Sequence, residues 1–316
     1  MNITRGVQKA PVKTLIYGPE GIGKSTLASK WPDPVFIDTE GSTKRMDVAR
    51  LPAPEEWDDI INEVKWVVQN PDIFKTLVVD TMDWAEMICS KKLFGDKGIE
   101  SPGYGKGYVM LAEKFKELLD ELDKVIAAGI HVTVTAHAYM RKFEQPDEIG
   151  AYDRWELKLQ KKTAPIVKEW ADMVLFCNYR TLVVNVDGQG AVKGKNKAQG
   201  GERVMYASHH NCWDAKNRFG LPDQMPMSFD SVAEIIDANL PKLTDFDRIP
   251  VKLRSLMERD KVEEFDIQNL VGAKGWAGCD SMTAIYKYPK ELIDFLSGDW
   301  EKVKEAITVN KEIPFD

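Results

Sequence analysis

The stretch from Gly18 to Ser25 constrains this chain more than any other, because it fits the phosphate-loop pattern GxxxxGK[ST] at every position. An apolar run at residues 14–17 precedes it and is typical of a short buried strand, while residues 25–30 are typical of the first turns of a helix. A glycine-rich turn that contained Lys and Ser by coincidence would not need these two flanking elements. The sequence therefore predicts a site for nucleotide phosphates.

The loop residues have separate predicted roles. Backbone N–H groups converge on the phosphates, Lys24 supplies a catalytic positive charge, and the Ser25 hydroxyl can ligate Mg²⁺. The residues predicted to bind ATP are Gly18, Pro19, Glu20, Gly21, Ile22, Gly23, Lys24, Ser25 and Thr26.

A second apolar run, residues 76–80, ends in an acid. Asp80 lies where a Walker B carboxylate would hold Mg²⁺ through its water shell, so Ser25 and Asp80 are the predicted metal residues. Asp83 is a nearby alternative, but its position one turn into the next segment favours a role as a helix cap.

Periodicity predicts alternating strands and helices as far as residue 240, followed by short amphipathic helices. We expect an α/β domain over residues 1–240 and a small helical module with an acidic tail over residues 241–316. The strands are expected at 14–17, 35–38, 76–80, 131–135, 172–177, 182–186 and 203–208, and the helices at 55–69, 109–128, 251–259, 265–273 and 291–307. Residues 101–108 contain three glycines and are expected to be a mobile loop, and residues 139–162 show no clear core face.

Composition limits the expected cellular location of the chain and the partners that it could bind. No apolar run approaches membrane-spanning length and the first residues resemble no targeting peptide, so we expect a cytoplasmic protein with no membrane partner. The net charge of −7 argues against nucleic-acid binding by the whole surface. Local patches are still basic, at Lys91, Lys92, Lys97 and Lys106, at Arg141, Lys142, Lys158, Lys161 and Lys162, and at Lys193, Lys195 and Lys197. Any one patch alone could be no more than a solvated loop.

The phosphate loop, together with residues 36–41, 77–80 and 134–137, resembles the core of RecA-like recombinases over most of the chain. In particular it resembles the compact phage branch, the Sak-type single-strand annealing ATPases, a phage AAA-type ATP-binding family. The resemblance implies a RecA-like P-loop NTPase core with a mostly parallel sheet flanked by helices, plus the C-terminal helical module. It places the residue that orients the attacking water at Glu40, which could instead cap the turn before Gly41. His137 stands where recombinases usually have a γ-phosphate-sensing Gln.

The same resemblance implies two mobile DNA-binding loops, which fall on residues 95–106 and 139–162. Lysines for the backbone and aromatic rings for base stacking are the chemistry that single strands require, and Phe143, Tyr152 and Trp155 supply rings in the second loop.

Residues 215–220 resemble the K-x-R element that RecA-like motors insert into the ATP site of a neighbouring subunit. Lys216 and Arg218 would then stabilise charge on the neighbour's γ-phosphate, which requires a homo-oligomer, either a ring or a filament. The alternative is a solvated basic turn. The terminal residues 312–316 resemble the Ile-Pro-Phe tail of bacterial single-strand binding proteins except that Asp316 follows the Phe, so such a protein, or another phage recombination protein, is a candidate partner.

The function favoured by these patterns is ATP-dependent single-stranded DNA binding and annealing or recombination. ATP and Mg²⁺ would be the cofactors, and DNA would stimulate ATP hydrolysis at subunit interfaces. The alternative is a nucleotide-driven motor or helicase-like subunit that acts on duplex DNA or a protein.

Overall fold

A computed structural model describes residues 3, 5–144, 150–185, 196–240 and 244–311. The chain divides into two compact units, residues 1–241 and 242–316, which we describe separately. The predicted residues Lys193 and Lys195 and the tail at 312–316 lie outside the described part. Within that part, no helix is both long and apolar enough to cross a lipid bilayer.

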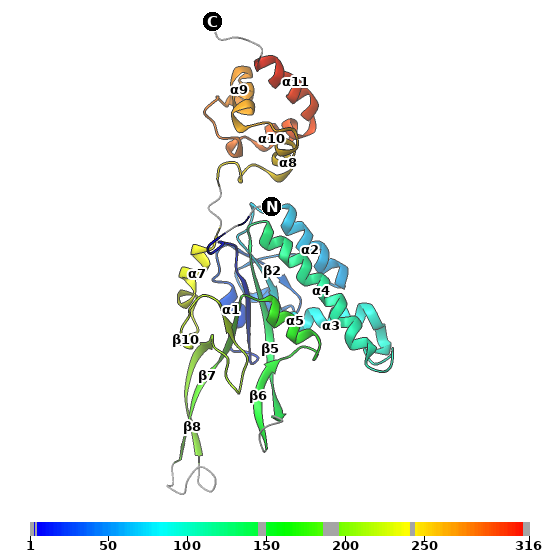
Figure 1. Ribbon diagram of the computed structural model, residues 1–316, viewed down its shortest axis with the longest axis vertical. Helices are drawn as coiled ribbons and strands as arrows, with labels where there is room; N and C mark the ends of the chain where they lie inside the picture. The colour runs from blue at the N-terminus through cyan, green and yellow to red at the C-terminus, as the bar shows by residue number, and fades with distance from the viewer. Residues whose placement is uncertain (1–2, 4, 145–149, 186–195, 241–243, 312–316) are drawn as a thin grey trace. The chain divides into compact units, whose positions relative to one another are not determined.

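The first unit is built on one sheet (Figure 1). Its strands are β1 (Lys13–Gly18), β2 (Pro34–Asp38), β3 (Ala49–Arg50), β4 (Thr76–Asp80), β5 (His131–Glu144), β6 (Ala151–Leu157), β7 (Met173–Asn185), β8 (Asn196–Tyr206), β9 (Lys216–Asn217) and β10 (Gln224–Pro226). The order is β10-β8-β7-β1-β5-β4-β2-β3, with β6 paired to β5 and β9 paired to β7. The six strands from β7 to β3 are parallel, and the others are antiparallel to their partners. The predicted α/β fold with a mostly parallel sheet is confirmed.

Helices cover both faces of this sheet. They are α1 (Lys24–Ala28), α2 (Trp57–Gln69), α3 (Met82–Phe94), α4 (Lys106–Ala127), α5 (Thr163–Trp170) and α7 (Ala233–Ala238), with 3₁₀ turns η1 (Ser42–Arg45), η2 (Gly95–Lys97) and η3 (Phe229–Ser231). Alternate strand residues enter opposite cores: Leu15 and Tyr17 pack with α2 to α5, whereas Ile16 packs with α1 and α7. Burial on both faces explains why the central strands are continuous apolar runs.

Two strands continue far beyond the core. β5 extends past His137 and pairs with β6 from Ala138 opposite Leu157 to Glu144 opposite Ala151, and β7 likewise continues into a ribbon with β8 (Figure 1). The prediction of a mobile loop over residues 139–162 is therefore wrong, because its β-forming aromatic residues pair across two strands. Since β1 lies between β5 and β7 and ends at Gly18, the phosphate loop starts between two strands that continue.

The second unit packs around its own core, which includes Leu253, Leu270 and Leu296. Its helices are α8 (Val251–Asp260), α9 (Glu264–Lys274), α10 (Lys290–Gly298) and α11 (Trp300–Lys311), with 3₁₀ turns η4 (Trp276–Gly278) and η5 (Ile285–Lys287). The single helix predicted over 291–307 is wrong. The chain breaks between Gly298 and Trp300, whose indole N–H donates to Asp260 Oδ2 at 2.6 Å, so α11 can turn back onto the core.

Candidate nucleotide site

The phosphate loop follows β1 and has a backbone that needs glycine at two points. A Cβ atom on Gly18 would lie 2.2 Å from the Cys177 carbonyl oxygen, so a side chain there would separate β1 from β7. Gly23, which precedes α1, has φ of 106°, a left-handed conformation that other residues adopt only with strain. The predicted strand, loop and helix are all present.

Lys24 points back into its own loop. Its Nζ donates to the carbonyl oxygens of Gly18 at 3.2 Å and Pro19 at 3.0 Å, and the side chain is buried. Burial lowers the pKa of Lys24, and the nearby carboxylates Asp80 and Asp83 oppose that shift. A cation with so little water around it is well placed to bind a phosphate oxygen, and such a ligand would replace carbonyl contacts that are weaker.

The other loop residues divide by exposure. Glu20, Gly21 and Thr26 are exposed and Ser25 is half-buried, so these groups are accessible to a ligand. Ile22 is fully buried in the core beneath α1, so any contact that it makes with phosphate comes from its backbone.

Asp38 organises the segment that carries Glu40. Its carboxylate accepts the backbone N–H groups of Gly41, Ser42 and Thr43 at 2.7, 3.1 and 2.9 Å, and the Thr43 hydroxyl at 2.6 Å. These bonds outweigh the effect of burial and lower the pKa of Asp38. The carboxylate therefore holds a tight turn, and the turn fixes the position of Glu40.

Asp80 is fully buried at the end of β4 and is hydrogen-bonded through both oxygens. Thr135 donates to Oδ1, and the Ser42 hydroxyl donates to Oδ2 at 3.1 Å. Within the described residues no cluster of three or more His, Cys, Asp or Glu side chains could hold a metal. A Mg²⁺ ion at Ser25 and Asp80, as the sequence predicts, would have to take most of its ligands from phosphate and water, as this cation commonly does.

His137 lies at the point where β5 leaves the core, between two carboxylates. Its Nδ1 is 2.8 Å from Asp83 Oδ2, its backbone N–H donates to Asp83 Oδ1 at 2.9 Å, and its Nε2 is 4.0 Å from Glu40 Oε2. Asp83 does not cap α3 as predicted, because Thr81 is the N-cap residue and the Asp83 carboxylate is directed at His137. An acceptor at Nδ1 places the proton on that nitrogen and leaves Nε2 directed at the Glu40 side.

The two carboxylates have opposite electrostatic environments. Burial alone would raise the pKa of Asp83, but the hydrogen bonds from His137 outweigh it and lower that pKa. The pKa of Glu40 is raised, chiefly by burial; His137 opposes that shift, and the nearby carboxylates Asp80 and Asp83 add to it. A carboxylate of raised pKa is a stronger base, which suits a group that must orient or deprotonate water.

Glu86 is a further buried acid, one turn beyond Asp83 on α3. Burial raises its pKa to about 7, although the Gln160 backbone N–H donates to its two oxygens at 3.2 and 3.0 Å. The Lys158 backbone N–H also donates to the His137 carbonyl oxygen, at 2.9 Å. The segment that follows β6 is thus hydrogen-bonded both to Glu86 on α3 and to His137, the residue that faces Glu40.

Lys216 and Arg218 lie away from the phosphate loop of their own chain. β9 pairs with the first residues of β7, which face the start of β1, whereas the phosphate loop follows its end. The Lys216 ammonium donates to three carbonyl oxygens at the end of α5, those of Lys168, Glu169 and Ala171, and Arg218 pairs with Asp172 at 2.8 Å. In one subunit these residues complete local structure, so a role in catalysis would have to be in a neighbouring subunit.

The rings predicted to stack on DNA bases are involved in protein packing. Trp155 packs against Phe176 of β7, with ring centroids 6.1 Å apart, at the edge of the main core. Phe143 contacts Tyr152 at 5.6 Å and the Arg154 guanidinium at 5.3 Å. The interpretation of Trp155 as a ring without a core contact is wrong, because its strand returns it to the sheet.

Charges on the β5–β6 hairpin balance within its described residues. Three cations, Arg141, Lys142 and Arg154, are matched by Glu144, Asp153 and Glu156. Arg141 pairs with Glu156 at 3.3 Å, and Arg154 pairs with Asp214. Exposed cations remain at Lys158, Lys161 and Lys162 after the hairpin and at Arg180 and Lys197 on the β7–β8 ribbon. The other predicted loop, residues 95–106, connects α3 to α4 on the flank and lies apart from both ribbons (Figure 1).

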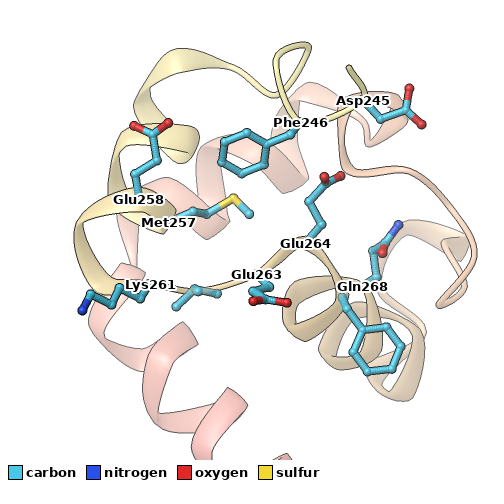
Figure 2. Close-up of a pocket in the computed structure, with 10 residues that line it drawn as sticks. Asp245, Phe246, Met257, Glu258, Lys261, Glu263, Glu264 and Gln268 are labelled. Carbon is cyan, nitrogen blue, oxygen red and sulfur yellow. The ribbon is translucent and has the colours of Figure 1, made fainter. Parts of the chain in front are cut away.

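The second unit contains a cavity of about 650 Å³ between α8 and α9 (Figure 2). Phe246 and Met257 lie next to one another in its wall, and the carboxylates of Asp245, Glu258, Glu263 and Glu264 outnumber the one lysine, Lys261. So much negative charge is unsuited to a phosphate ligand. The nucleotide site therefore belongs to the first unit.

Sequence reasoning did not find Asp38, Ser42 and Thr135, and it misread Asp83. Asp38 could have been recognised, because an Asp followed by Gly three residues later often accepts backbone N–H groups in a turn. The contacts of Ser42 and Thr135 join separate strand ends, and no local pattern reveals them.

Comparison with known proteins gives a family match. A family model described as an AAA domain matches residues 10–219. Among solved structures, the chain is similar to the flagellar accessory protein FlaH from Methanocaldococcus jannaschii, with 13% identity, coverage of 63% of this chain and 85% of that chain, and a TM-score of 0.30. None of the curated proteins compared matches the chain.

Proposed function

Because the chain belongs to the AAA domain family, we propose that it hydrolyses ATP at the edge of its sheet and uses the cycle to bind and anneal single-stranded DNA. The observation that supports this most is the arrangement of Glu40, His137 and Asp83 beside a complete phosphate loop. When bound, Mg²⁺ would offset phosphate charge. Lys24 binds phosphate, and Glu40 orients the attacking water.

The same arrangement suggests how nucleotide and DNA binding could be coupled. His137 Nε2 lies 4.0 Å from Glu40 Oε2, while its backbone continues into the β5–β6 hairpin and accepts a hydrogen bond from Lys158. The exposed cations Lys158, Lys161 and Lys162 follow directly, and they are the groups that we assign to the DNA backbone. Arg218 would act on a neighbouring subunit's nucleotide, so the active form would be a homo-oligomer.

Single-strand binding is tested by measuring the affinity of a fluorescent oligodeoxythymidylate as a function of salt, with and without ATP. We expect tighter binding with ATP, and a steep fall with salt of about 0.7 log units per phosphate contact for each log unit of salt. Changing Lys158, Lys161 and Lys162 together to Gln should reduce that slope by about 2.

The matched control changes Lys65, Lys116 and Lys124 to Gln, which removes the same charge from exposed positions on α2 and α4. Equal effects of the two triple variants would contradict a local DNA site. Binding that does not depend on salt, or ATP-driven unwinding of a tailed duplex without preference for bare strands, would instead favour the motor or helicase-like function.

A further inference from the structure

A second feature adjoins the phosphate loop, on the face of the sheet that α1 covers. It is a cavity of about 480 Å³, lined by residues of α1, by Arg203 of β8 and by the segment that follows β10. The volume lies within the range of small-molecule sites and is large enough for a nucleoside. Gly23 and Thr26, from the predicted ATP-binding set, form part of its wall.

Arg203 lies over the end of the phosphate loop. Its Nη1 atom is 3.1 Å from the position that a Cβ on Gly23 would occupy. Among the residues that the structure describes, no carboxylate forms an ion pair with this guanidinium, whereas its neighbour on the ribbon, Arg180, lies 3.9 Å from Glu202. A guanidinium held beside the loop without a counter-ion is suited to a phosphate oxygen.

Phe229 and Met227 supply an apolar part of the lining, beside the polar residues Lys30, Ser228 and Asp230. Met227 lies close to the arginine, since its Cε atom is 3.9 Å from the same Cβ position on Gly23. Phe229 packs edge-on against the buried Trp31, with ring centroids 5.1 Å apart, and Met227 lies next to it in the same wall. The Met227 backbone N–H donates to the Arg203 carbonyl oxygen at 3.1 Å, so the segment after β10 is bonded to the strand that carries the arginine. An aromatic ring and a thioether are suitable partners for the face of a nucleobase.

We infer that this cavity binds the nucleoside of ATP, with the base against Phe229 and Met227 and with Arg203 on the phosphate nearest the ribose. The inference rests on the proposed nucleotide binding and assigns the part of the ligand that the phosphate loop does not hold. Arg203 would then connect nucleotide occupancy to the β7–β8 ribbon, since the same strand continues into that ribbon.

The experiment measures equilibrium binding of ATP and of inorganic tripolyphosphate by calorimetry, because only ATP carries a nucleoside. Wild-type protein should prefer ATP by about tenfold or more, and Phe229→Leu, which keeps an apolar group against Trp31, should remove most of that preference. Arg203→Gln should weaken both ligands by about tenfold, because its phosphate is present in each. Arg180→Gln is the matched control and should bind both ligands as the wild type does.

Each remaining outcome separates this inference from the proposed function. If Phe229→Leu and Arg203→Gln both bind ATP normally while Lys24→Ala does not, the nucleoside site is wrong and the phosphate loop stands. If wild-type protein binds neither ligand, the proposed function itself fails. Equal affinity of the wild type for ATP and tripolyphosphate would also overturn the nucleoside site.

Discussion

The nucleotide edge of the sheet and the β5–β6 hairpin share strand β5, yet different contacts stabilise them. At the edge, the buried acid Asp38 accepts hydrogen bonds from the turn that follows it, and Asp80 accepts one from that turn and one from β5. On the hairpin, pairing is between strands, the charges are balanced, and Trp155 contacts the core. The contacts at the edge depend on particular buried side chains, whereas the ribbon is held by backbone pairing, which tolerates changes of side chain.

The largest expected effect is on the chemical step at the edge. Glu40→Gln keeps the shape of the side chain but removes the base, so turnover should fall by about 100-fold or more while ATP affinity is retained. Steady-state ATPase assays and nucleotide binding measure the two quantities separately. Glu113→Gln, an exposed change on α4 away from the phosphate loop, is the control. If Glu40→Gln hydrolyses ATP at the wild-type rate, the catalytic base lies elsewhere and Asp80 is the next candidate.

On the hairpin the expected effect is on stability. Trp155→Ala removes a ring that packs against Phe176, and should lower the free energy of unfolding by about 3 kcal/mol. Its affinity for single-stranded DNA should stay that of the wild type wherever the variant is folded. Chemical denaturation measures the first and oligonucleotide titration the second. Trp66→Ala on α2, where the side chain is 40% exposed, should cost less than about 1 kcal/mol. A tenfold loss of DNA affinity in Trp155→Ala would restore the base-stacking hypothesis.

A smaller effect is expected for Glu86 on α3, whose carboxylate accepts hydrogen bonds from the segment that follows the β5–β6 hairpin. Its pKa in the folded protein is about 7 and its ordinary value is 4.5, so between these pH values the folded state holds a proton that the unfolded state has lost. Its contribution to stability is therefore complete below pH 4.5 and disappears as the pH rises through 7, at up to about 1.4 kcal/mol per pH unit. Glu86→Gln should make stability depend less on pH in this window.

Unfolding curves at several pH values test this prediction. Glu63, whose pKa burial also raises to about 7, remains in the variant, so part of the slope should persist. The exposed Glu144→Gln is the control. An unchanged slope in Glu86→Gln would show that this carboxyl group does not hold a proton in the folded protein.

Much of the edge could be predicted from sequence because its signals are local. The phosphate loop, the apolar run that ends at Asp80 and the acid at Glu40 each follow a strand within a few residues. The role of Asp83 could not be predicted, since its partner His137 is 54 residues away and meets it only when β5 lies beside α3. An Asp in the first turn of a helix gives the same sequence signal whether its carboxylate caps the helix or contacts a distant histidine.

The hairpin shows a different limit of prediction. Residues 139–144 alternate in burial, but neither face is fully apolar, so the sequence pattern alone does not predict a strand there. Strand pairing between residues 138 and 157 decides the structure there, and pairing partners are not encoded locally. The break between α10 and α11 has the same origin, because the Trp300 contact with Asp260 spans 40 residues.

The continuity of β5 through His137 also has a mechanical meaning. Glu144 lies seven positions beyond His137, a distance of about 24 Å along an extended strand. A strand paired along that length is stiff, so a rotation of the chain at His137 moves the whole extension as one rigid unit. A tilt of about 5° at His137 would move Glu144 by about 2 Å, given the rise per residue of a strand. A small rotation at His137 that leaves the packing around the nucleotide intact would thus move the far end of β5 by more than the length of a covalent bond.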